Sequence, residues 1–133
     1  MQLRTICKSK IHHATVTGAD VEYVGSVGID AELLERADIV TGEMVAVWNV
    51  STGARIETYA IPLPAGSGQV VLNGAAARHF QKGDKIIIVA FALTDEPLSP
   101  RMLLVDERNA FAGWLLSEGL DWPVAATEPL ISP

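Results

Sequence analysis

Short hydrophobic runs rich in β-branched residues recur along the chain, and they predict a protein built mainly of strands. The run at 85–93 is the most hydrophobic, and its length and flanking turn residues are typical of a buried strand. Runs 43–50 and 55–61 are separated by a turn at 51–53 and are expected to pair as a hairpin. The full set of predicted strands is 3–8, 11–17, 43–50, 55–61, 69–72, 85–93 and 102–105.

Three segments have helical rather than strand features. Asp30 is a favourable N-cap residue followed by acidic residues, so 30–38 is predicted to be a short helix. Residues 73–80 are expected to form a helical turn capped by Asn73. Residues 109–118 have helical periodicity, and 121–133, with three prolines, are expected to be a loose tail. Short strands with so little helix favour a β-barrel or sandwich.

The stretch 22–30 resembles a strand but contains Gly25 and Gly28, and glycine in a strand usually marks a bulge or a close approach. Gly25 directly precedes Ser26, so a hydroxyl lies beside the carbonyl of a residue without a Cβ. We expect Gly25 to adopt backbone angles that other residues resist, leaving its carbonyl open to attack by Ser26 Oγ. A simple bulge or turn is the alternative interpretation.

Length, composition and net charge limit the class of protein to which this chain can belong. The 133 residues, 49% of them hydrophobic, suffice for one domain with a core. The net charge of −6 argues against a nucleic-acid partner. No run reaches the roughly 18 residues of a membrane span, and the N-terminus lacks an apolar signal region, so a cytoplasmic location is expected. The lone Cys7 is expected to be a small buried hydrophobe, and His12 and His13 to lie on opposite faces of a strand without sharing a metal ion.

Six short motifs occur in order along the chain: Lys10-x-His12, Tyr23-x-Gly25-Ser26, Ile29-Asp30, Trp48-Asn49-Val50, Arg55-x-x-Thr58-Tyr59-Ala60 and Asn73-Gly74-Ala75-Ala76-Ala77. Together they resemble the bacterial aspartate 1-decarboxylase family, over residues 1–95. The resemblance implies a double-psi β-barrel core over 1–95, with 96–133 as the last strand, helix and tail of the same domain. It also implies a homotetramer with active sites between subunits, which makes β-alanine for pantothenate and coenzyme A.

The resemblance implies a cofactor made from the chain itself. Decarboxylation of an α-amino acid needs an electron sink on the nitrogen, and we find no convincing pyridoxal phosphate site in the sequence. In the family, Ser26 attacks the Gly25 carbonyl, the chain breaks between them, and residue 26 becomes a pyruvoyl group that forms a Schiff base with the substrate. Tyr59 is the proton donor, and Thr58 contacts the substrate and assists cleavage. Strand alternation would put Thr58 and Tyr59 on opposite faces, and cleavage is either spontaneous or assisted by a maturation factor.

A substrate that keeps its side-chain carboxylate needs cationic partners. Arg55 offers a planar fork for a carboxylate, and Lys10 offers a second positive charge. Backbone N–H groups at a helix N-terminus also suit an anion, and the resemblance places Gly74, Ala75 and Ala76 there. It further assigns four residues to the pocket walls: His12, Tyr23, Trp48 and Asn73.

Several alternatives stay open from the sequence. Arg55 and Lys10 are equally compatible with solvated surface charges, and Tyr59 with a half-buried strand tyrosine. The substrate is aspartate or a related acidic amino acid. Two other classes are a non-catalytic barrel that binds partners and a hydrolase with Ser26 as nucleophile and His12 or His79 as base. The hydrolase lacks the Gly-x-Ser-x-Gly turn that usually presents such a serine.

Overall fold

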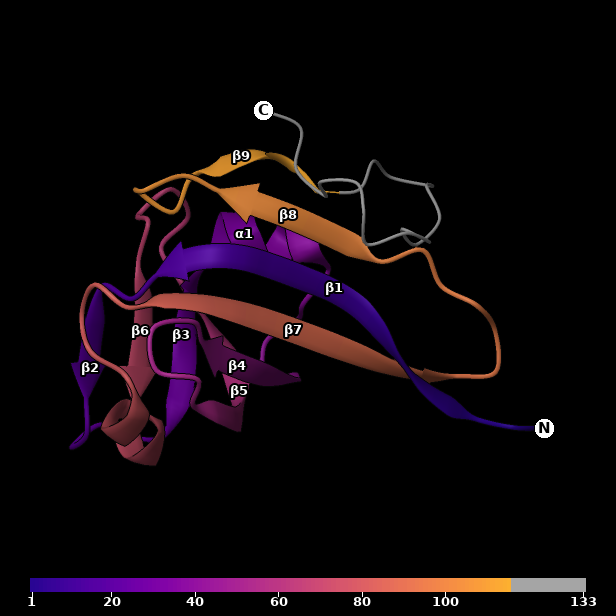
Figure 1. Ribbon diagram of the computed structural model, residues 1–133, viewed down its shortest axis with the longest axis horizontal. Helices are drawn as coiled ribbons and strands as arrows, with labels where there is room; N and C mark the ends of the chain where they lie inside the picture. The colour runs from indigo at the N-terminus through magenta and orange to yellow at the C-terminus, as the bar shows by residue number, and fades with distance from the viewer. Residues whose placement is uncertain (116–133) are drawn as a thin grey trace.

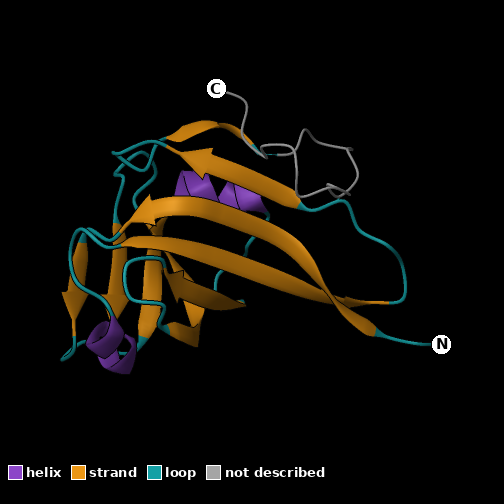
Figure 2. Cartoon of the chain, viewed as in Figure 1, coloured by secondary structure: helices purple, strands orange, loops and turns teal. Residues whose placement is uncertain are grey.

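The computed structural model describes residues 1–115, and this part of the chain is mainly β (Figure 1, Figure 2), as predicted. The strands are β1 (Arg4–Thr15), β2 (Gly18–Asp20), β3 (Ser26–Asp30), β4 (Met44–Asn49), β5 (Arg55–Leu63), β6 (Val70–Asn73), β7 (Lys85–Thr94), β8 (Arg101–Val105) and β9 (Phe111–Trp114). The helices are α1 (Ala31–Ala37) and the 3-10 helix η1 (Gly74–His79). Within residues 1–115, neither helix has the length and apolar character required to cross a membrane.

The strands form one mixed sheet in the order β2-β6-β3-β5-β4-β7-β1-β8-β9. The pairs β1–β8, β2–β6 and β3–β5 are parallel, and the other neighbours are antiparallel. In Figure 1, β1, β7 and β8 run along the long axis, whereas β2, β6 and β3 cross them steeply. The sheet is therefore strongly curved, and its concave face encloses the core. The predicted hairpin is confirmed as β4–β5.

The core consists of aliphatic side chains from almost every strand. Fully buried members include Ile11, Val27, Val47, Leu72 and Ile88. Helix α1 covers this core and contributes its own buried leucines and alanine. Burial of this apolar surface is the main favourable term in folding, at roughly 25 cal/mol per Å².

Asp30 caps α1, as predicted, and it also anchors a distant loop. Its Oδ1 accepts hydrogen bonds from the backbone N–H of Glu32 at 2.9 Å and of Gly66 at 3.0 Å. Its Oδ2 accepts one from Gly68 N–H at 2.9 Å. The carboxylate satisfies backbone donors of both the helix and the loop before β6, so the Ile29-Asp30 motif has a structural role.

Two strand predictions need correction. Residues 3–8 and 11–17 are not separate strands, because β1 runs continuously from Arg4 to Thr15. Its pairing with β7 shifts register twice, at Cys7/Ser9 and at Ile11/Ala14. A bulge lets a strand continue through such a shift, so the polar residues at its centre do not end it. The short strand β2 was not anticipated.

The predicted helix at 109–118 is wrong over its described part. Phe111–Trp114 forms β9, which pairs antiparallel with β8. The turn before it is set by Asn109, which has a left-handed φ of 61° and is buried. Its side chain bonds Thr15 N and Thr15 O and also Gly68 O, each at 2.8 Å, and these contacts fix a turn that local periodicity does not reveal. Residues 116–118 and the predicted tail at 121–133 lie outside the described residues.

Candidate active site

Ser26 begins β3 and lies between β5 and β6. It is only 2% exposed and pairs directly with Asn73 of β6. The Asn73 side chain donates a hydrogen bond from Nδ2 to Ser26 Oγ at 3.1 Å. Asn73 occupies the N-cap position of η1, but it makes no capping hydrogen bond, so the prediction that it caps this helix is wrong. Its amide is used to hold the serine instead.

The sheet register brings Tyr59 next to Ser26. Val27 pairs with Ala60 of the parallel strand β5, and both are fully buried in the core. Because residues alternate between faces, the preceding residues Ser26 and Tyr59 are neighbours on the opposite face. Tyr59 is 40% exposed there. The predicted nucleophile and the predicted proton donor therefore share one face of adjacent strands.

Thr58 lies on the other face from Tyr59, as alternation predicted. The β4–β5 register is continuous, with Thr58 opposite the buried Val45 and Tyr59 opposite the exposed Met44. No bulge turns the two side chains to the same side. Thr58 therefore lies on the core side of β5, next in the chain to Tyr59.

Gly25 does not have the unusual backbone that its sequence context suggested. Its φ is not positive, and a Cβ at this position would meet no atom within 4 Å. The prediction that Gly25 adopts angles resisted by other residues is therefore wrong for the intact chain. Sterics require glycine at Gly74 instead. This residue begins η1 and lies directly against the Gly25 backbone.

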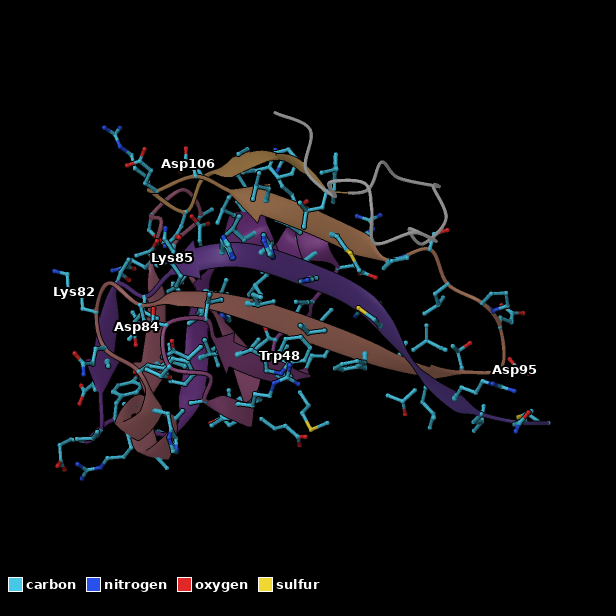
Figure 3. All side chains as sticks on the ribbon, viewed as in Figure 1. Trp48, Lys82, Asp84, Lys85, Asp95 and Asp106 are labelled. Carbon is cyan, nitrogen blue, oxygen red and sulfur yellow. The ribbon has the colours of Figure 1, made fainter. Side chains whose placement is uncertain are left out.

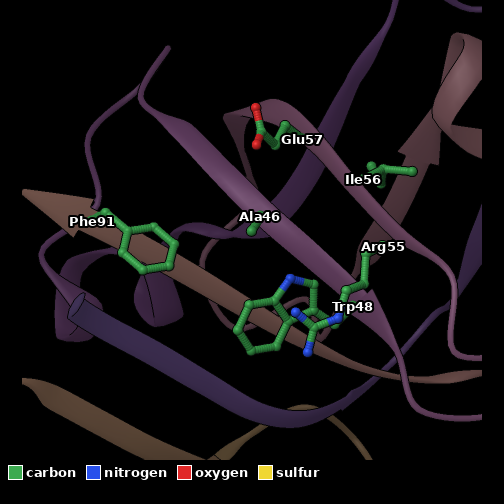
Figure 4. Close-up of a pocket in the computed structure, with 6 residues that line it drawn as sticks. All are labelled: Ala46, Trp48, Arg55, Ile56, Glu57 and Phe91. Carbon is green, nitrogen blue, oxygen red and sulfur yellow. The ribbon is translucent and has the colours of Figure 1, made fainter. Parts of the chain in front are cut away.

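Arg55 and Trp48 form a separate cationic and aromatic unit. The Arg55 guanidinium lies 4.1 Å from the centroid of the Trp48 ring, a cation–π arrangement. Both line an open groove of ≈ 550 Å³ (Figure 4), and Figure 3 shows Trp48 beside β7. Arg55 is on the same face of β5 as Tyr59, because the two are four residues apart along the strand. The groove residues are Ala46, Trp48, Arg55, Ile56, Glu57 and Phe91. Among residues 1–115, Arg55 has no carboxylate within ion-pair distance.

Counted along the sheet, the predicted cations are far from Ser26. Arg55 is four residues from Tyr59 along β5, about 13 Å at the strand rise of 3.3 Å per residue. Lys10 shares the groove face, since it pairs with Val89, which pairs with Ala46. Its strand β1 is four positions from β3 in the sheet, about 19 Å at the usual strand spacing.

His12 and His13 do not point to opposite faces, so that prediction is wrong. His13 has a left-handed φ of 62° within the second register shift of β1, and the two rings stack with centroids 3.8 Å apart. Burial, then the nearby His13 and Lys10, lower the pKa of His12 from 6.5 to about 4. Its buried Nδ1 has no hydrogen-bond partner within residues 1–115. The same part of the chain holds no cluster of three or more metal-ligating side chains.

The remaining candidate residues are Tyr23, the start of η1 and His79. Gly74, Ala75 and Ala76 form the start of η1, beside Gly25, and the half-exposed Tyr23 is close enough that its carbonyl oxygen faces Gly74. The nucleophilic hydroxyl has no histidine partner: within the described residues, Ser26 Oγ bonds the side chain of Asn73. His79 is exposed, and its carbonyl accepts a hydrogen bond from Asn49. A hydrolase dyad at Ser26 is therefore not assembled.

Comparisons with known proteins agree with the motifs. Residues 1–112 match the model of a family described as aspartate decarboxylase. A protein of Carboxydothermus hydrogenoformans named aspartate 1-decarboxylase is 53% identical over 109 residues, covering 79% of this chain and 86% of that protein. One of the same name from Desulfitobacterium hafniense is 54% identical over 110 residues, covering 80% and 87%. A rationally designed protein, mkDPBB_sym_86, gives a TM-score of 0.44 with 19% identity, over 59% of this chain and 91% of that one.

Proposed function

Since this chain belongs to the aspartate decarboxylase family, we propose that it converts aspartate to β-alanine and CO2 with a pyruvoyl group made from its own Ser26. The activity is that of a carboxy-lyase, and the mainly β sheet agrees with the double-psi β-barrel that the resemblance implies. The observation that carries the cofactor proposal is the placement of Ser26. Its hydroxyl is buried, held by Asn73, and next in the chain to the Gly25 carbonyl.

The proposed maturation is a sequence of steps on the chain itself. Ser26 Oγ bonds to the Gly25 carbonyl carbon, the peptide C–N bond breaks, and the hydroxyl proton passes to the nitrogen, which leaves an ester. Loss of the Ser26 Cα proton then breaks the Cβ–Oγ bond, releasing the Gly25 carboxylate and leaving a dehydroalanine. Water replaces its nitrogen, which departs as ammonia, and residue 26 becomes a pyruvoyl group. In this proposal Thr58, next to Tyr59 on β5, stabilises the oxyanion of the first step.

The residues around Ser26 suit a pyruvoyl group at position 26. Once formed, the pyruvoyl group supplies a keto carbon that takes the substrate amine and a conjugated carbonyl that accepts the electrons left by CO2. Tyr59, the neighbour of Ser26 on the same sheet face, then delivers a proton to the substrate carbon. The start of η1 lies against Gly25, so the backbone N–H groups of Ala75 and Ala76 are available to an anionic group there.

We further propose that each site is completed by a second copy of the chain, in a homotetramer. Along the sheet, Arg55 is about 13 Å from Tyr59, and β1, which carries Lys10, is about 19 Å from β3, whereas the two carboxylates of aspartate are only a few bonds apart. The face that carries these residues also exposes large apolar side chains, among them Met44, Tyr59 and Phe91. A neighbouring copy seated on this face would bring its cations to Ser26 and cover the apolar surface.

The remaining elements of the proposal concern the cell and the maturation step. Provision of β-alanine for pantothenate would place the enzyme in the cytoplasm. Cleavage either proceeds unaided or is assisted by a maturation factor, and the rate of fragment formation by the purified chain decides between these two routes.

One denaturing mass spectrum tests the cofactor proposal. The mature enzyme should give fragments 1–25 and 26–133, the larger one without a free amine and reactive toward carbonyl reagents. Ser26→Ala should stay full length and release no CO2 from aspartate, and Ser26→Cys serves as the matched variant that keeps a nucleophile. An active wild-type enzyme made only of intact chains would refute the pyruvoyl proposal.

A further inference from the structure

Gly74 lies directly against the backbone of the proposed cleavage site. A Cβ at this position would lie 2.7 Å from Gly25 Cα, 2.9 Å from Gly25 N and 3.1 Å from the carbonyl oxygen of Tyr23. Side-chain atoms can rotate away from such an overlap, but these three are backbone atoms. Gly74 also has a left-handed φ of 65° and is buried, so both its conformation and its surroundings require glycine.

The contrast with Gly25 shows which glycine fits tightly. Gly25 has open space where a Cβ would point, and its φ is ordinary. The residue before Gly74 is Asn73, whose side chain holds Ser26 Oγ. Two consecutive residues therefore contact the two sides of the bond to be cleaved. Asn73, at the end of β6, hydrogen-bonds the attacking Ser26 Oγ, and Gly74, at the start of η1, packs against Gly25.

We propose that Gly74 is a positioning residue for self-cleavage, in addition to the anion contact that the family resemblance implies for it. Its contact with the Gly25 backbone sets the position of the Gly25 carbonyl relative to Ser26 Oγ. This inference rests on the proposed function and concerns its first step, in which the Oγ–C bond forms, the C–N bond breaks and the proton moves from Oγ to nitrogen. A displacement of about 1 Å in such a geometry costs on the order of 10²-fold in rate.

The test compares two alanine variants that each replace a glycine of positive φ. Gly74→Ala and Gly53→Ala both place alanine at a positive φ, but a Cβ at Gly53 meets no atom within 4 Å. Each chain is purified intact and the fragments are followed by denaturing mass spectrometry. We expect Gly74→Ala to cleave about 10²-fold more slowly than wild type and Gly53→Ala to cleave within a few-fold of it. Equal rates for the two variants would overturn the inference.

Two further measurements separate positioning from folding. In the uncleavable Ser26→Ala background, both variants should unfold cooperatively, the Gly74 variant at the lower temperature because its Cβ displaces backbone atoms. If only the Gly74 variant fails to fold there, its role is structural and the inference is wrong. Hydroxylamine, which cuts esters, should cut wild-type precursor between residues 25 and 26 much faster than Gly74→Ala, because the ester forms more slowly in the variant. The fragment masses distinguish this cut from one at the hydroxylamine-sensitive Asn73–Gly74 bond. Ester formation at the wild-type rate in Gly74→Ala would also overturn it.

The same experiment distinguishes failure of this inference from failure of the proposed function. If wild-type protein never yields fragments 1–25 and 26–133, the pyruvoyl proposal falls, and the role of Gly74 falls with it. If wild type and Gly74→Ala both cleave at the same rate, the pyruvoyl proposal stands and only the role of Gly74 is lost.

Discussion

Asn73 donates its side-chain amide to Ser26 Oγ across the antiparallel pair β6–β3, with a nitrogen–oxygen distance of 3.1 Å. Both residues are at least nine-tenths buried, at 6% and 2% exposure. A buried hydroxyl with a fixed partner has one preferred rotamer, whereas a free serine samples three. The hydrogen bond therefore selects the direction in which Oγ points before any bond to Gly25 forms.

Asn73→Ala should slow cleavage by about 10-fold, the rate equivalent of one hydrogen bond worth roughly 1–1.5 kcal/mol. The substitution leaves Ser26 Oγ free to rotate and opens room for water beside it. The half-time of fragment formation gives the measurement, and the melting temperature of the uncleaved chain is the control for folding. Cleavage by Asn73→Ala at the wild-type rate would show that the rotamer of Ser26 is set by other contacts.

Tyr59→Phe should mature normally and turn over poorly. The phenol is outside the steps that break the chain, so mass spectra should show the same fragments as wild type. CO2 release from aspartate should fall by about 10²–10⁴-fold, the range that a positioned general acid supplies. Met44→Leu, opposite Tyr59 on β4, is a suitable control because it alters the same surface without removing a proton donor. A Tyr59→Phe enzyme of full activity would assign the proton to another group.

The sequence predicted which residues belong to the site around Ser26. It did not predict which of them are neighbours, because that depends on how the strands pair. Alternation along 55–61 predicted that Thr58 and Tyr59 face opposite sides, and β5 confirms it. That Ser26 lies beside Tyr59 depends on the parallel pairing of β3 with β5, which joins strands far apart in sequence. No local pattern encodes such a pairing.

Two of the failed predictions have a common physical cause. The helix expected at 109–118 and the opposed histidines at 12 and 13 were both inferred from local periodicity. In each case one residue with positive φ, Asn109 or His13, changes the direction of the chain. Asn109 is held there by hydrogen bonds to Thr15 and Gly68, which are distant in sequence. Tertiary contacts of this kind override local preference.

The glycine that sterics require was also misplaced by sequence reasoning. The Gly-Ser pair drew attention to Gly25, but an added Cβ is accommodated there and is excluded at Gly74. The signal for Gly74 was present only as a small-residue run after Asn73. The steric requirement for Gly74 arises from the pairing of β6 with β3, which brings Gly74 against Gly25.

Arg55→Lys should weaken substrate binding more than it slows turnover. Lysine keeps the charge but lacks the planar fork for a carboxylate and the flat group that stacks on Trp48. We expect KM for aspartate to rise about 10- to 100-fold, corresponding to a charge-assisted hydrogen bond of roughly 1.5–3 kcal/mol, with cleavage unchanged. Arg4→Lys is the matched control, because the exposed side chain of Arg4 hydrogen-bonds only Gln2 among the described residues. An unchanged KM in Arg55→Lys would exclude Arg55 from carboxylate binding.

The stability of the protein should fall as the pH drops below 6.5, partly because of His12. Burial and the neighbouring His13 and Lys10 lower the pKa of His12 in the folded chain to about 4, whereas an unperturbed histidine titrates near 6.5. Between these values the unfolded chain binds the proton and the folded chain does not. The free energy of unfolding therefore rises with pH across this window and is independent of His12 above it.

His12→Gln isolates this contribution, because it removes the titrating ring and keeps a polar side chain. Melting temperatures of the Ser26→Ala chain, with and without His12→Gln, should be compared between pH 5 and 7.5, above the range in which ordinary carboxylates protonate. The chain that keeps His12 should lose more stability on acidification, and the partial exposure of the ring keeps the difference smaller than for a fully buried group. Parallel curves for the two chains would mean that His12 titrates as an ordinary histidine. A steeper loss in His12→Gln would mean that another group, with the opposite sign of shift, governs the acid response.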